Sequence, residues 1–149
     1  NVDVYSKDMG WRSANQKGRF MLAVAIMREA ARSIAQGDGL IRLGDFGRRH
    51  GLSPRLVRNV VSDLQAGGVL VETAGDSDVV AVRVGIDSYT VGDVVRTLLE
   101  LGVSPVSLGV THLSTSSAAG EEIERAIAGG MATRIKDLPD NEARVEADG

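Results

Sequence analysis

The sequence contains no cysteine, which excludes disulfide bonds, cysteine nucleophiles and zinc sites held by cysteine. It contains only two histidines, His50 and His112, and neither lies at the spacing of a metal site or of a nucleophile and its base. Glycine-rich motifs of the kind that cradle phosphates, such as GxGxxG, are also missing. We therefore predict a chain that is not an enzyme, with no catalytic residue, no metal site and no cofactor.

Long apolar runs are missing as well. The longest, residues 20–27, is far shorter than the roughly 20 residues that span a bilayer, and no signal-peptide pattern opens the chain. With 43% hydrophobic residues among 149, the chain is long enough to bury the core of one domain. These features predict a fragment that is itself soluble, in a reducing, cytosolic setting.

Charge is spread unevenly along the chain. The net charge is −3, yet residues 1–72 carry eleven Lys or Arg and seven Asp or Glu, whereas residues 73–149 carry six and thirteen. This distribution keeps binding of a polyanion possible for one face and discourages it for the whole molecule.

The first half of the chain predicts three helices and a short strand. Residues 17–36 carry apolar residues at three- and four-residue steps, residues 40–41 indicate a strand, and residues 44–50 indicate a brief helix. Ser53 and Pro54 then predict a helix start, because serine caps free amides and proline at the first helical position loses no hydrogen bond.

The Ser53-Pro54 helix is predicted to end near Ala66, followed by a hairpin and another helix. Gly67 and Gly68 supply the positive φ that ends the helix. Residues 69–72 and 79–84 are β-rich, and TAGDSD between them (residues 73–78) predicts the hairpin tip. The stretch TVGD (residues 90–93) resembles a capping box and begins an amphipathic helix over residues 91–101.

The remainder of the chain predicts less structure. Residues 103–117 are small, polar and rich in Ser and Thr, which indicates a linker or an irregular arm. Residues 118–138 predict a helix broken or weakened at Gly129 and Gly130, followed by an acidic tail. The apolar residues of that helix recur at four-residue steps: Ile123, Ile127, Met131 and Ile135.

The order helix, short strand, helix, helix, hairpin, helix is that of a winged helix-turn-helix. The predicted fold class is mainly α with a small β-hairpin (α+β), a winged helix-turn-helix with a C-terminal helical appendage. We divide the chain into an N-terminal lead (residues 1–16), a winged-helix domain (17–102), a linker (103–117) and a helical, acidic tail (118–149).

The helix that begins at Pro54 is the one that would read DNA in this fold. Four of its side chains are expected on the outward face: Arg55, Arg58, Asn59 and Ser62. Arginine and asparagine can pair with guanine and adenine edges, and Arg42, Arg48 and Arg49 are candidates for phosphate contacts. Against DNA binding stands the hairpin tip, which carries Asp76 and Asp78 and no basic residue. The alternative is a solvated helix face, or one that contacts protein.

The sequence resembles two families. The lead VYSKDMGWRS, the segment RLGDFGRRHGLSPRLVRNVVSDLQAGGVLVE and the later YTVGDVVRTLLELG resemble the cytosolic C-terminal extension of YihY/BrkB-type bacterial membrane proteins, often labelled ribonuclease BN. The same module is similar to the DNA-binding domain of Rrf2-type transcription regulators. That second resemblance rests on one pattern of residues: Leu43, Leu52, Ser53, Pro54, Val57, Leu64, Gly68, Val69 and Leu70.

The first resemblance implies a domain at the cytoplasmic face of the bacterial inner membrane, attached through a segment upstream of Asn1. The absence of an initiator Met agrees with that expectation, as do Tyr5 and Trp11, which are interleaved with basic residues as in segments next to a membrane. Rrf2-type sensors commonly hold an iron–sulfur cluster through cysteines, which this chain lacks.

Three hypotheses follow. The first is a non-catalytic winged-helix domain of a YihY/BrkB-like membrane protein that mediates protein interaction, self-association as a dimer, or regulation. The second is an Rrf2-like transcriptional regulator that binds DNA bases through Arg55, Arg58 and Asn59. The third, part of a ribonuclease, rests on the family label alone.

Overall fold

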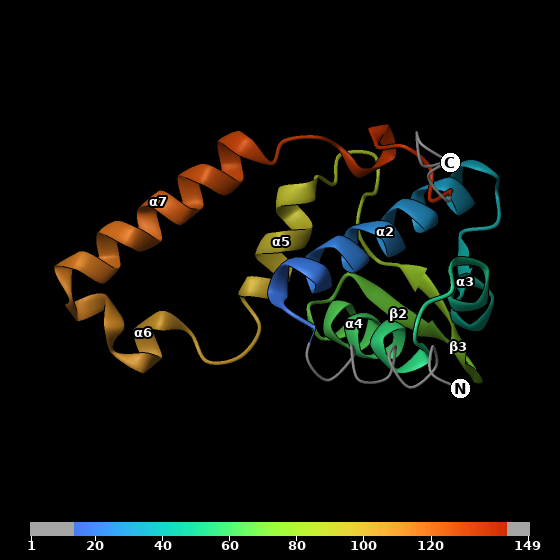
Figure 1. The fold of residues 1–149 in the computed structure, drawn as a ribbon, viewed down its shortest axis with the longest axis horizontal. Coiled ribbons are helices and arrows are strands. Elements are labelled where there is room, and N and C mark those ends of the chain that lie inside the picture. The colour runs from blue at the N-terminus through green and yellow to red at the C-terminus, as the bar shows by residue number, and fades with distance from the viewer. Residues whose placement is uncertain (1–13, 143–149) are drawn as a thin grey trace, which may run out of the picture.

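The computed structural model describes residues 14–142, so the predicted lead lies almost wholly outside the described residues. The first part contains helices and three short strands, and helices alone follow (Figure 1). The elements are α2 (Gln16–Ala35), β1 (Leu40–Arg42), α3 (Leu43–His50), α4 (Pro54–Ala66), β2 (Leu70–Thr73), β3 (Asp76–Val82), α5 (Val91–Leu99), α6 (Pro105–Leu108), η1 (Val110–His112), α7 (Ser114–Gly130) and η2 (Ile135–Asp137).

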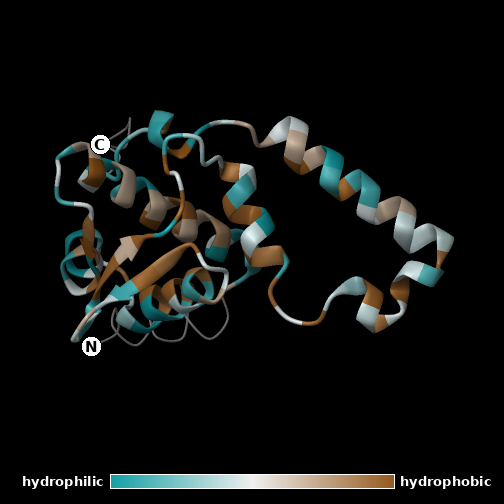
Figure 2. Cartoon of the chain, turned by 180° about the vertical axis from the view of Figure 1, so that it is seen from behind, coloured by the Kyte–Doolittle hydropathy of each residue, from teal (hydrophilic) through white to brown (hydrophobic). Residues whose placement is uncertain are grey.

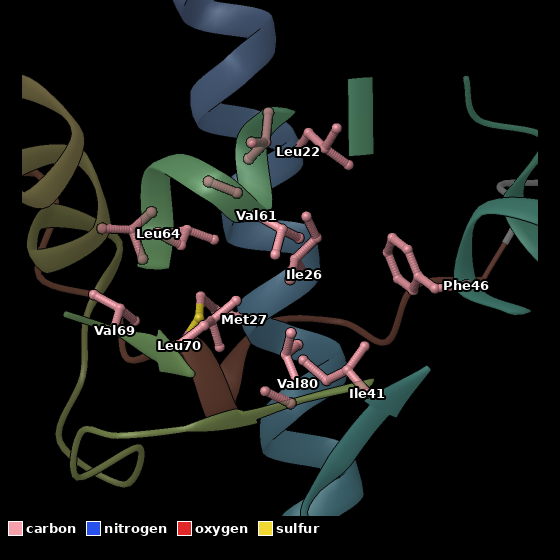
Figure 3. Packing of buried hydrophobic residues seen from close by; sticks show 14 of the residues in the cluster. Leu22, Ile26, Met27, Ile41, Phe46, Val61, Leu64, Val69, Leu70 and Val80 are labelled. Atoms are coloured by element: carbon pink, nitrogen blue, oxygen red, sulfur yellow. The ribbon is translucent and has the colours of Figure 1, made fainter. Parts of the chain in front are cut away.

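Helix α2 is the centre of the core. It begins where the Asn15 side chain accepts a hydrogen bond from the Gly18 amide at 2.8 Å, and it packs against α4, α5 and β1. Ile26 and Met27 of α2 are fully buried in one cluster with Val61 and Leu64 of α4 (Figure 3). The predicted helix over residues 17–36 is confirmed to within one residue at each end.

Helices α3 and α4 form the helix-turn-helix. Gly51 ends α3 with a φ of 63°, in the left-handed region that favours glycine. Ser53 accepts a hydrogen bond from the Leu56 amide at 3.4 Å, and Pro54 occupies the first turn of α4. Gly68, with a φ of 77°, then turns the chain into β2. The predicted start and end of α4 are therefore confirmed.

The three strands form one antiparallel sheet in the order β1-β3-β2, and β2 and β3 form the wing. The predicted hairpin tip over residues 73–78 is wrong in its length. Thr73 already pairs with Asp76, so the turn is tight, with Gly75 at a φ of 81°. Asp78 consequently lies within β3 and not at the tip, because the two central turn residues suffice to reverse the chain.

An arm follows the winged helix. The capping box of Thr90 and Asp93 at the start of α5 is confirmed, and α5 ends at Leu99, two residues before the predicted end. Residues 103–117 are predicted as a linker or an irregular arm, but they are not irregular, because α6, η1 and the first turn of α7 lie there. Ser104 caps α6 through the Ser107 amide, and Pro105 occupies its first position, the same start signal as in α4. In Figures 1 and 2, α6 and α7 extend away from the body of the molecule.

The last helix also differs from its prediction. Helix α7 begins at Ser114, four residues before the predicted start, and ends at Gly130, so the predicted break at Gly129 and Gly130 is confirmed. Of the four apolar residues in the predicted stripe, Ile127 and Ile135 are buried, whereas Ile123 is 53% exposed and Met131 is half-buried. The stripe fails because the chain leaves the helix at residue 131.

Residues 131–142 return to the body and bind it through their backbone. The amides of Val91 and Gly92 donate to the carbonyls of Thr133 and Met131 at 2.9 and 2.8 Å, and the Ile135 amide donates to the Tyr89 carbonyl at 2.8 Å. The arm is therefore held to the body at both ends, at α5 and at this returning segment. None of the helices between residues 14 and 142 is long and apolar enough to cross a lipid bilayer.

We expect Gly92→Ala to lower the free energy of unfolding by about 1–3 kcal/mol, although alanine favours helices. A Cβ on residue 92 would lie 3.0 Å from the carbonyl oxygens of Ile127 and Met131. The matched control is Gly120→Ala in α7, where a Cβ meets nothing within 4 Å. This control should raise stability by up to about 1 kcal/mol. Urea unfolding followed by circular dichroism measures both variants, and equal effects would contradict the docking of residues 131–142 on α5.

Candidate nucleic-acid interface

The outward face of α4 is built by helical periodicity. Val57, Val60, Val61 and Leu64 are buried and hold the helix against the core. Arg55, Arg58 and Ser62 are exposed and Asn59 is half-buried, at steps of three and four residues. The structure therefore brings these four predicted residues together on one side of α4.

The orientation of α4 is fixed by an ion pair as well as by its apolar face. Asp63, on the flank of α4, binds the guanidinium of Arg19 on α2. This pair is only partly exposed, so salt screens it less than a surface pair. It links the position of α4 to that of α2.

Ion pairing separates the predicted basic residues into two groups. Arg48 binds Asp45, and Arg49 lies 3.4 Å from the Glu29 carboxylate. Arg55 and Arg58, in contrast, form no ion pair with any residue between 14 and 142. The two arginines of α4 are thus the ones whose charge is available to a ligand without breaking an internal contact.

A hollow of about 310 Å³ lies beside α4, between α3, the start of α4 and β3. Its floor is apolar and includes Leu43, Leu52 and Val57, whereas Arg48 and Arg58 border it. Arg48 and Arg58 therefore flank one concave surface, although they come from different helices.

The acidic residues of the wing lie in two places. Asp78 borders the hollow, but its carboxylate faces the start of α3, where it lies 3.4 Å from the Gly44 amide. Negative charge at a helix N-terminus is favourable, so Asp78 has a structural use there. Asp76 and Glu72 remain exposed on the wing.

Glu29 and Arg32, both on α2, were not singled out from the sequence. Glu29 of α2 is 7% exposed and binds Arg32 through Oε2 at 2.7 Å, in addition to Arg49 of α3. Burial alone would raise the pKa of Glu29, but the hydrogen bond and charge of Arg32, together with Arg49, outweigh it and hold the pKa below 4.5. The available signal was a carboxylate three residues after Ile26, on the apolar face of a predicted helix.

The comparisons with known proteins concern the fold. No protein-family model matches the chain, and no curated protein matches it. The oxidized form of CymR from Staphylococcus aureus is similar, with 17% identity, a TM-score of 0.57 and coverage of 83% of this chain and 96% of CymR. A second CymR structure has 17% identity and a TM-score of 0.56, and the match covers 83% of this chain and 98% of CymR. IscR from T. potens has 19% identity and a TM-score of 0.56, and the match covers 80% of this chain and 81% of IscR. CymR and IscR are Rrf2-family regulators, so the winged-helix fold expected from the sequence is confirmed.

We expect Glu29→Gln to lower the free energy of unfolding by about 1.5–3 kcal/mol at neutral pH, because Arg32 and Arg49 lose a buried charged acceptor. The folded pKa of Glu29 is lowered, so its contribution is complete above pH 4.5 and is lost as the pH falls through the folded value. The stability difference between the two proteins should therefore shrink on acidification. Urea titrations at several pH values measure it.

Glu100→Gln is the control for this variant, since Glu100 is exposed and forms no ion pair with the described residues. It should change stability little at any pH. If the difference in free energy of unfolding between wild type and Glu29→Gln stays constant down to pH 3, the fold does not hold the Glu29 carboxylate in its charged form.

Proposed function

We propose that this chain is a DNA-binding winged-helix domain of a transcriptional regulator, with α4 as the recognition helix. The observation that carries the proposal is the pair Arg55 and Arg58, exposed on the outward face of α4 and free of ion pairs among the described residues. The likeness in fold to two Rrf2-family regulators supports it, as does the resemblance of the sequence to Rrf2-type DNA-binding domains.

The chemistry of the α4 face suits a major groove. Arginine pairs with the O6 and N7 atoms of guanine, and asparagine pairs with adenine. Arg55, Arg58 and Asn59 lie within the first two turns of α4, the part of a recognition helix that contacts base edges. We assign Arg48 and Arg49 of α3 to contacts with DNA phosphates. To make these contacts, Arg48 must exchange or share Asp45, and Arg49 must exchange or share Glu29.

Self-association is the second part of the proposal, and the arm favours it. The segment from Leu99 to Ile123 exposes several large apolar side chains. In Figure 2, part of α6 and of the chain beside it is coloured as hydrophobic. Their exposed fractions range from 38% to 72%: Leu99, Val103, Val106, Leu108, Val110, Leu113 and Ile123. A two-fold dimer covers such a surface and presents two copies of α4 to successive major grooves, about 34 Å apart.

The expected membrane attachment stays a prediction, since the lead on which it rests lies mainly outside the described residues. An inner-membrane location is compatible with DNA binding by a domain on the cytoplasmic side. The ribonuclease hypothesis gains no support from a specific residue of the described chain, and we do not carry it further.

We expect the chain to bind a mixed-sequence DNA duplex at low salt, with an affinity that falls steeply as salt rises. The double variant Arg55→Ala/Arg58→Ala should bind at least about tenfold more weakly, with a salt slope smaller by about 2, because two contacts to DNA are lost. Fluorescence anisotropy with a labelled duplex measures both quantities.

The matched control for DNA binding is Arg125→Ala/Arg134→Ala, which removes two exposed arginines that also form no ion pair with the described residues. It removes the same charge at a distance from α4, so its effect should be small. Equal losses in the two double variants would mean that only net charge matters, and absence of binding by the wild type at low salt would overturn the proposed function.

For the dimer, we expect Ile123→Asp to convert a sedimenting dimer into a monomer at tens of micromolar protein. Ile123 is 53% exposed on α7, so the variant should keep its fold. Ile34→Asp, at a similarly exposed isoleucine near the end of α2, serves as the control and should remain dimeric. A monomeric wild type would contradict self-association.

A further inference from the structure

A second hollow, of about 470 Å³, lies where the end of α2 meets β1 and α3. Its lining is mainly polar and carries four arginines from these three elements: Arg32, Arg42, Arg48 and Arg49. Three carboxylates line it with them, those of Glu29, Asp38 and Asp45, so the hollow has a net charge of +1.

Glu29 is the fixed point of this cluster. Its buried carboxylate accepts hydrogen bonds from Nε and Nη2 of Arg32, at 3.4 and 2.7 Å, and attracts Arg49 from the neighbouring helix. A guanidinium has five donors, so both arginines retain free donors after these contacts. Glu29 therefore holds two arginines from different helices at one hollow, as a positioning residue.

The other two arginines can exchange their partners at low cost. Arg42 binds Asp38 at 2.9 Å and Arg48 binds Asp45, and all four side chains are between 44% and 76% exposed. Exposed ion pairs of this kind contribute little to stability. A dianion can thus replace Asp38 and Asp45 as acceptor without disturbing the core.

We propose that this hollow binds a phosphate group, with Arg32 and Arg49 held in place by Glu29 and with Arg42 and Arg48 closing on it. A guanidinium pairs with phosphate oxygens through parallel hydrogen bonds, and four arginines line this hollow. Arg48 borders both this hollow and the one beside α4. The phosphate is therefore either a group of the DNA backbone next to the α4 contact or a free phosphate compound.

The first experiment uses inorganic phosphate and does not depend on the proposed function. At constant ionic strength, phosphate in place of chloride should shift the arginine Nε–Hε NMR signals of Arg32 and Arg49 in the wild type. In Arg42→Gln/Arg48→Gln, which alters exposed side chains outside the core, the dissociation constant should rise by about tenfold. Arg125→Gln/Arg134→Gln should leave it unchanged.

The second experiment uses the mixed-sequence DNA duplex and rests on the proposed function. If the bound phosphate belongs to DNA, Arg42→Gln/Arg48→Gln lowers the salt slope by about 2, as for two lost phosphate contacts. If the slope is unchanged while inorganic phosphate binds, the ligand is a free phosphate compound. Failure of the wild type to bind DNA overturns the proposed function, whereas the result of the first experiment stays valid. A lack of response to phosphate together with an unchanged slope overturns this inference.

Discussion

The packing of α4 on α2 is the contact on which the rest of the candidate interface depends. Val61 and Leu64 of α4 are buried in the same cluster as Ile26 and Met27 of α2, and the ion pair of Arg19 and Asp63 joins the same two helices. Burying such side chains contributes about 1.5–3 kcal/mol each, which fixes the rotation of α4 about its axis. Because that rotation is fixed, the side chains at steps of three and four on the opposite face must point outward.

Internal ion pairs then decide which outward charges are available. Most arginines of the first half that the structure describes bind a carboxylate, and Arg55 and Arg58 are the exceptions. A chain of net charge −3 can therefore present two uncompensated positive charges on one helix. Asp78 of the wing lies at the start of α3, where negative charge is favourable.

Much of this fold follows from local signals, and the remainder does not. Ser53, Pro54 and the glycines after α4 act within a few residues, so the limits of α4 could be predicted from the sequence. The length of the wing turn depends on the pairing of Thr73 with Asp76, which the composition of the tip does not show. In the arm, Ser104 and Pro105 give the same start signal as in α4, within a segment whose Ser and Thr content indicates a linker. The cluster at Glu29 joins residues twenty apart in sequence, Glu29 and Arg49, and only the fold brings them together.

The central claim is that the outward face of α4 contacts DNA. Backbone amide NMR spectra recorded while a mixed-sequence duplex is added at low salt test it most directly, because they locate the contact without altering the protein. The account predicts that the largest shifts belong to α4, at Arg55, Arg58 and Asn59, with small shifts in α7. Unchanged α4 signals, or the largest shifts confined to the arm, would contradict it.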